Sequence, residues 1–351
     1  MYNLCCISND LKEKGISFRT MTFKRFLQLC EQSGDEKALF ELGSRWLNNV
    51  KVTIESIKHC SRNNWGYRVS SSIFPCLTHP EFKYDISDVP QYKEIMQIFA
   101  VNRPALIWTP KRDEEDDMYT DEDISLGVRL SIHPDQFNVL ASNNQNAVNK
   151  TINELNYQGW LMDQLGCQRN HFNPINIHVN CTDGSLEEIA QRFISNLKRC
   201  HISVKKRIVL ENEDKGCWNV QNLITYFYNP YGIPITFDNL HHMCNPSPLL
   251  DNDELAMEEC AKTWNCRPIF HYSESDPNKT NPRSHAEMPR SFPKNNQYDW
   301  DVELKSKDKA IRAVASMATN HDMKKLKLKS DAARWKTLLS DQGIQNNGWN
   351  M

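Results

Sequence analysis

The sequence predicts an α/β protein built as a single (β/α)8 TIM barrel, and three observations favour that fold. Short apolar runs of strand length alternate with stretches of helical periodicity about eight times along the 351 residues, as repeated βα units require. The sequence shows neither an internal repeat nor a linker that would divide the chain. Most of the apolar runs end in a histidine or a carboxylate, and a barrel would collect these side chains at the face where active sites lie.

The expected elements follow one another in that pattern from the first residues onward. Strands are expected at residues 2–7, 67–70, 105–108, 128–132, 175–177, 208–210, 233–237, 268–270 and 300–302. Helices are expected at residues 22–30, 36–60, 89–101, 147–165, 186–200, 219–228, 253–263 and 307–317. The acidic stretch 111–123 is expected to loop out. We therefore predict a barrel domain at 1–319 and, at 320–351, a basic helical extension packed on the barrel or trailing from it.

Composition limits where the protein acts and what it binds. The formal net charge of −2 excludes a polycationic coat, so nucleic acid would have to meet a local basic surface. The twelve cysteines form no CxxC pair, and the first residues lack the layout of a signal peptide. No apolar run approaches the roughly 20 residues of a membrane span. We expect a cytoplasmic protein with reduced thiols and no membrane partner.

The segment RIVLENEDK, at 207–215, shows the pattern that recurs along the chain. An apolar run, Ile208 to Leu210, ends in Glu211, and a carboxylate at the end of a buried strand stays ionised only if a positive group meets it. Five other strand ends carry the same residue types, namely His133, His178, Asp238, His271 and Glu303. Three more histidines lie in loops expected at the same face, namely His79, His241 and His285.

This set of side chains predicts a metal cluster. A single buried histidine is more often structural than a ligand, but six strand ends should not all carry ligand types by chance. Imidazole with carboxylate suits Zn²⁺ or Mn²⁺, and the oxygen donors favour Mn²⁺ or Mg²⁺. Several close ions are typical of phosphodiester hydrolysis. A sugar isomerase, which also uses His, Glu and Asp at barrel strand ends, is the main competing enzyme class.

Seven segments in this order resemble the ultraviolet damage endonuclease family, ATP-independent repair nucleases related in fold to endonuclease IV. The resemblance runs from about Tyr2 to Thr319. The segments are YRVSSSIFPCLTHP, RLSIHPDQFNVLAS, INIHVN, VLENEDK, ITFDNLHH, FHYSES with RSHAEM, and VELKSKDKA. The resemblance implies a barrel with up to three divalent ions, usually manganese. It also implies nicking of DNA 5′ to cyclobutane dimers and 6-4 photoproducts, which leaves a 3′-hydroxyl and a 5′-phosphate.

The resemblance also assigns roles to residues. His133, His178 and Glu211 match the ligands of one metal, and Glu211 matches a bridge to a second. The second metal is shared with Asp238, His271 and Glu303, the third is bound by His241 and His285, and His79 lies at the edge of the cluster. Gln136 and Phe137 match a probe pair that enters the duplex at the lesion, and Asn9 matches a further lesion contact. The chain departs from its relatives at Ile269, where they carry a lysine.

Two further expectations come from position and fold. Lys305, just past Glu303, is expected to hold the phosphate, although a solvated surface lysine would have the same spacing. We expect a monomer that grips damaged double-stranded DNA on one face. The alternatives to a photoproduct nuclease are an endonuclease for abasic sites, a sugar isomerase, and a damage-binding protein without activity.

Overall fold

The structure, a computed structural model, describes residues 1–106, 127–250 and 252–341, and its strands form a single parallel barrel. The strands are β1 (Tyr2–Cys5), β2 (Gly66–Val69), β3 (Leu130–Ile132), β4 (Ile175–Ile177), β5 (Ile208–Glu211), β6 (Ile235–Thr236), β7 (Ile269–Tyr272) and β8 (Asp299–Val302). They pair in the order β6-β5-β4-β3-β2-β1-β8-β7. A parallel bridge between Asp238 and His271 joins the two outer strands, and the His271 N–H donates to the Phe237 carbonyl at 2.9 Å. The predicted barrel is confirmed.

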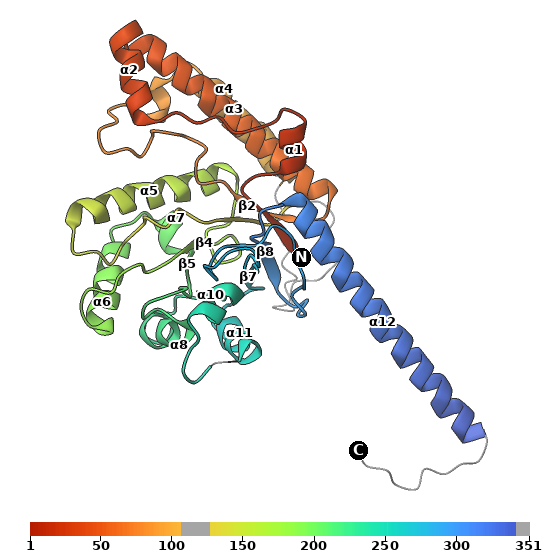
Figure 1. Ribbon diagram of the computed structural model, residues 1–351. Helices are drawn as coiled ribbons and strands as arrows, with labels where there is room; N and C mark the ends of the chain where they lie inside the picture. The colour runs from red at the N-terminus through yellow and green to blue at the C-terminus, as the bar shows by residue number, and fades with distance from the viewer. Residues whose placement is uncertain (107–126, 251, 342–351) are drawn as a thin grey trace.

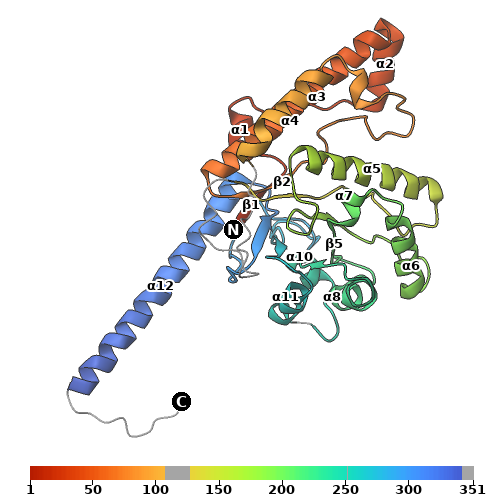
Figure 2. The ribbon, with the colours of Figure 1, turned by 180° about the vertical axis from the view of Figure 1, so that it is seen from behind.

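Helices surround the barrel, and some of them extend beyond it. The helices are α1 (Asn9–Glu13), α2 (Phe23–Ser33), α3 (Asp35–Arg62), η1 (Ile86–Asp88), α4 (Tyr92–Leu106), α5 (Gln145–Gln164), α6 (Leu186–Leu197), α7 (Ile202–Lys205), α8 (Val220–Leu223), η3 (Ile224–Tyr228), α9 (Asn229–Tyr231), α10 (Asn239–Cys244), α11 (Asp253–Lys262) and α12 (Asp308–Asp341). In Figures 1 and 2, α2, α3 and α4 project from one side of the barrel, and α12 runs away on another.

Two expected boundaries differ from the structure. Ala105 and Leu106 belong to α4, not to a strand, because a short apolar run fits the end of a helix as well as a strand. Residues 107 and 108 and the acidic stretch 111–123 lie outside the described residues. The predicted domain boundary at Thr319 falls inside α12, which runs away from the barrel in Figure 1. The division into a barrel domain and an extension stays a prediction.

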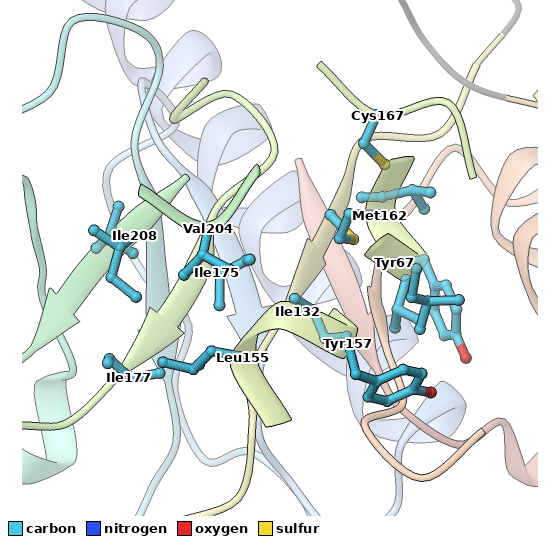
Figure 3. Packing of buried hydrophobic residues seen from close by; sticks show 14 of the residues in the cluster. Tyr67, Ile132, Leu155, Tyr157, Met162, Cys167, Ile175, Ile177, Val204 and Ile208 are labelled. Carbon is cyan, nitrogen blue, oxygen red and sulfur yellow. The ribbon is translucent and has the colours of Figure 1, made fainter. Parts of the chain in front are cut away.

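The strands are short, and their side chains alternate between two environments. Figure 3 shows outward-facing residues such as Ile175 and Ile177 packed with Leu155 of α5 and Val204 of α7. The residue between the two isoleucines, Asn176, therefore faces the barrel interior. Outward apolar contacts anchor each strand to its helices and leave the inward positions free for polar chemistry.

The barrel interior has a polar layer that reaches the strand ends. Asp301 of β8 accepts hydrogen bonds from Asn3 Nδ2 at 2.7 Å and from Ser131 Oγ at 3.4 Å. The Arg68 guanidinium lies 3.6 Å from the same carboxylate, and His271 Nε2 lies 3.7 Å from it. The interior thus connects directly to a predicted ligand. No helix in the described ranges is long and apolar enough to cross a membrane.

Candidate metal centre

Glu211 lies at the centre of the face where the strands end. Its carboxylate is 1% exposed, and one oxygen, Oε2, lies 3.0 Å from His133 Nε2 and 3.1 Å from His271 Nδ1. His178 Nε2 lies 3.8 Å from that oxygen, and His241 Nδ1 lies 3.1 Å from Oε1. One buried carboxylate is therefore surrounded by four imidazoles from four different strand ends or their loops.

Two groups of three side chains are close enough for each to hold a metal ion, and Glu211 belongs to both. His133, His178 and Glu211 form one group, and Glu211, Asp238 and His271 form the other, with ligand atoms within 4.8 Å of one another. This is the arrangement that a bridging carboxylate would require. We call these five residues the strand-end cluster.

The segment after β6 brings His241 to the cluster. Asp238 is the N-cap of α10, and its Oδ1 accepts the His241 N–H at 2.7 Å. The Asn212 side chain accepts the Asp238 N–H at 2.8 Å and donates to the Asp238 carbonyl at 3.1 Å. His241 Nδ1 lies 2.9 Å from the Asn212 carbonyl. A short cap and one asparagine thus turn the chain so that His241 points back at Glu211.

Glu303 and His285 lie beside the strand-end cluster. Glu303 Oε1 lies 3.2 Å from His271 Nδ1, and it also accepts a hydrogen bond from Arg68 Nη1. His285 Nδ1 lies 2.8 Å from the Glu303 carbonyl and 3.8 Å from Glu303 Oε2. Among the described residues, neither Glu303 nor His285 completes a group as tight as the two that contain Glu211.

The electrostatics favour an ionised Glu211. Burial alone would raise the pKa of the Glu211 carboxyl, but His271 and His178, with hydrogen bonds from His133 and His241, lower it well below its usual value. Burial likewise opposes the charge on His241, yet nearby carboxylates raise its pKa to about 11. Without metal, the anion is balanced by protonated imidazoles, so cations must displace protons to bind.

The pKa values of His178 and Asp238 shift in the directions opposite to those of His241 and Glu211. Burial lowers the pKa of His178 to about 4, which leaves a neutral ring of the kind that metals bind. Burial raises the pKa of Asp238, because its carboxylate has 0% exposure. Both effects reflect the cost of charge in a site shielded from water.

The donor set fits divalent metal ions. Asp238 Oδ2 is buried and has no hydrogen-bond partner among the residues that the structure describes. A buried lone pair without a donor is costly, and a bound cation would satisfy it. The mixture of carboxylate oxygens and imidazole nitrogens suits Mn²⁺ or Zn²⁺.

Three further predicted site residues belong to neither group of metal-ligand type that contains Glu211. The His79 ring stacks on Phe23 with centroids 3.9 Å apart. Lys305 Nζ pairs with Asp276 Oδ2 at 3.3 Å, and its side chain is 43% exposed. Asn9 is the first residue of α1, not a loop residue. Their assigned roles stay predictions.

Gln136 and Phe137 lie in the loop after β3, three and four residues past His133. Phe137 is 76% exposed, which rules out its burial under a loop. An aromatic ring held in solvent at the rim of a polar site is available to a partner. The role of this pair as a probe remains a prediction.

Two residues of the site were not singled out from the sequence. Asn176 Nδ2 donates to Glu211 Oε2, and Arg68 donates to Glu303. Each is a polar residue flanked by apolar ones in a strand, and that alternation is the signal that places both inside the barrel.

A second cluster of the same residue types lies between α1, α3 and α12. Asp10, His59 and Asp308 are close enough to hold an ion, and we call them the His59 cluster. Asp308 Oδ1 accepts from Ser8 Oγ at 2.8 Å and lies 2.8 Å from His59 Nε2, and its Oδ2 accepts the Asn9 N–H at 2.6 Å. Both oxygens of Asp308 are already hydrogen-bonded.

Comparison with known proteins identifies the family. The profile described as UV-endonuclease UvdE matches residues 2–107 and 122–336. The chain belongs to the UV-endonuclease family. Among curated relatives, the UV DNA damage endonuclease of Bacillus cereus (strain B4264) is 28% identical over 310 residues, covering 84% of this chain and 86% of the relative. The protein of the same name from Bacillus pumilus (strain SAFR-032) is 27% identical over 310 residues, with the same coverage.

A solved structure supports the fold. The crystal structure of SacUVDE superposes with a TM-score of 0.69 at 24% identity, covering 91% of this chain and 98% of that one. Family membership confirms the predicted enzyme class, a phosphodiester hydrolase, and sets aside the sugar isomerase.

Proposed function

We propose that the protein is a metal-dependent DNA repair endonuclease that nicks the damaged strand 5′ to ultraviolet photoproducts, leaving a 3′-hydroxyl and a 5′-phosphate. Its substrates in this proposal are cyclobutane pyrimidine dimers and 6-4 photoproducts in double-stranded DNA, and ATP is not required. The observation that carries the proposal is Glu211, a buried carboxylate shared by two groups of metal-ligand type in a chain of the UV-endonuclease family.

Up to three divalent ions, manganese in this proposal, would supply a water of lowered pKa and neutralise charge on the phosphodiester in the transition state. His133 and His178 would hold one ion with Glu211. Asp238 and His271 would hold a second with Glu211, beside Glu303. His241 and His285 would hold the third ion, with His79 at the edge of the set.

The other residues orient ligands or DNA. Asn176 donates to Glu211 and would fix the carboxylate, as partners of metal ligands commonly do. Lys305 would hold a phosphate oxygen after exchanging its Asp276 partner for DNA. The exposed Phe137 and the neighbouring Gln136 would enter the duplex, where flipping costs least at a poorly stacked lesion. Since the net charge is −2, local basic contacts must hold the backbone, and binding should weaken as salt rises.

The test is cleavage of an end-labelled duplex containing one thymine dimer, with Mn²⁺, with chelator, and with Glu211→Gln. A cut directly 5′ to the dimer that chelator and the substitution abolish supports the proposal. An abasic duplex and an undamaged duplex serve as controls. Cleavage of the abasic duplex alone would reassign the substrate, and binding without cleavage of any duplex would leave a damage-binding protein.

A further inference from the structure

The loop that carries Phe137 is hydrogen-bonded to the neighbouring strand-end loop through Asn180. Asn180 Nδ2 donates to the Gln136 carbonyl at 2.8 Å, and the Asn180 backbone N–H donates to Glu213 Oε1 at 2.7 Å. Within the described ranges, the bond from Asn180 is the hydrogen bond that joins Gln136 to another strand-end loop. One residue therefore connects the loops after β3, β4 and β5.

These three loops leave the barrel next to the strand-end cluster. Gln136 follows His133 by three residues, and Asn180 follows His178 by two. Glu213 follows Glu211 by two. The residues joined through Asn180 thus lie two or three positions beyond His133, His178 and Glu211 along the chain.

The side of this connection that lies on β4 and β5 is held firmly. Glu213 is 8% exposed, and its backbone N–H donates to the Trp218 carbonyl at 2.9 Å. The buried Trp218 indole Nε1 in turn donates to the Cys181 carbonyl at 2.6 Å. The Asn180 backbone is therefore held by the buried Glu213, and the next residue, Cys181, is held by Trp218.

The tip of the loop that carries Phe137 has hydrogen bonds within the loop itself. The Phe137 N–H donates to Asp135 Oδ1 at 2.9 Å, and Asn138 Nδ2 donates to the Asp135 carbonyl at 3.0 Å. These bonds shape the turn.

Beyond Phe137 the chain is held by α5 and α6, because the Val139 N–H donates to Thr151 Oγ1 at 3.0 Å and Asn196 Nδ2 donates to the Leu140 carbonyl at 2.8 Å. The tip at 135–137 still needs a link to the neighbouring strand-end loop. The bond from Asn180 to Gln136 supplies that link.

Asn180 can be tested without disturbing the backbone. Its φ of 50° is left-handed, a conformation that glycine adopts freely and asparagine tolerates better than most residues. Replacement by glycine would keep the N–H bond to Glu213 and remove only the side-chain bond to Gln136.

We propose that Asn180 is a positioning residue for Phe137. Its side-chain amide holds the loop after β3 at a fixed place over the end of β4, so that the exposed ring meets the duplex in register with the candidate metal centre. This inference rests on the proposed function, because it assigns Phe137 to the lesion.

The experiment compares Asn180→Gly with Asn64→Gly. Asn64 is a matched control, since it is exposed and has a φ of 55°. It lies in the turn between α3 and β2, at the start of a strand and not at the C-terminal strand ends that carry the candidate metal centre. Two substrates carry the same dimer, one in a fully paired duplex and one inside a mismatched bubble whose bases are already unstacked. Amide exchange of residues 135–137 in the free protein provides a readout that does not involve DNA.

We expect Asn180→Gly to speed amide exchange at 135–137 and to lower kcat/KM on the paired duplex about five- to tenfold, the effect of one lost hydrogen bond. The bubble should restore activity toward wild type, because an opened lesion needs less help from the probe. Asn64→Gly should change neither the amide exchange of the loop after β3 nor kcat/KM on either substrate. The double variant Asn180→Gly with Phe137→Ala should lose less kcat/KM on the paired duplex than the two single losses combined, because both substitutions act through the Phe137 ring.

Two outcomes would overturn the inference. Equal losses on the paired duplex and the bubble would place the effect of Asn180 at the metal centre, and unchanged exchange with unchanged cleavage would show that Asn180 does not hold the loop. Failure of the proposed function looks different, because the wild type itself would then nick neither substrate, and the exchange measurement would still test the hold on the loop.

Discussion

The strand-end cluster and the His59 cluster contain the same kinds of side chain but differ in how their lone pairs are satisfied. In the strand-end cluster, Asp238 Oδ2 is buried without a hydrogen-bond partner among the described residues. In the His59 cluster, Asp308 has a donor or an imidazole at each oxygen. Donor identity and spacing are therefore not enough to define a metal site, and unsatisfied buried acceptors are the better guide.

The largest effect is expected from Glu211→Gln. The amide would remove the anion that two ligand groups share, so we expect nicking of dimer-containing DNA to fall by roughly 10³-fold or more. Initial rates with Mn²⁺, together with metal content by mass spectrometry, provide the measurement. Asp308→Asn is the matched control in the His59 cluster, and a similar loss of rate there would contradict the distinction.

Asp308→Asn should instead destabilise the fold. The new NH₂ group would face the Asn9 N–H, which now donates to the carboxylate, so we expect the free energy of unfolding to fall by about 2–4 kcal/mol. Urea unfolding with and without Mn²⁺ measures it. If metal rescued this variant selectively, the His59 cluster would have to bind an ion.

A smaller effect is expected at Asn176, which orients Glu211 without being a ligand. Asn176→Ala should weaken metal affinity by about 10- to 100-fold, as for other residues that support ligands. Calorimetric titration of the metal-free protein would show it. Wild-type affinity in this variant would mean that the strand-end cluster keeps its geometry without the amide.

The smallest effect is a pH dependence at the edge of the His59 cluster. The hydrogen bond from Arg312 lowers the pKa of Asp10, so the pair stabilises the fold at pH above the unfolded value of about 3.9, and this contribution disappears as pH falls through the folded pKa. Arg312→Met should cost about 1 kcal/mol or less at neutral pH.

Chelator during these unfolding measurements removes any contribution from metal. The difference between wild type and Arg312→Met should shrink toward zero in acid. A constant difference from pH 3 to pH 7 would show that Arg312 stabilises by packing on Trp65, where its guanidinium lies 5.5 Å from the ring centroid.

Sequence pattern predicted the barrel and the convergence of the candidate ligands, because parallel apolar strands that end in His, Asp or Glu bring those side chains to the same end of the barrel. His133, Glu211 and Asp238 follow from that rule alone. Arg68 and Asn176 could have been found by the same alternation, since each is a polar residue in an inward position.

Other features were not accessible from pattern. The His59 cluster joins residues about 300 positions apart, and no local signal marks Asp308 as the partner of Ser8 and Asn9. The expected strand at 105–108 overlapped α4, because short apolar runs fit a helix end as well as a strand. Long-range closure and element boundaries depend on tertiary contacts that one sequence does not display.

Asp308 also has a consequence for the order in which the molecule forms. It fastens α1 to the start of α12, and β1 pairs with β8. A chain emerging from the ribosome cannot make these contacts until residue 308 is available, so the edge of β1 stays uncovered for most of synthesis. The His59 cluster, to which we assign no role in cleavage, would then hold the two ends of the barrel domain together. Its contacts would be among the last to form and among the first that a shortened chain would lose.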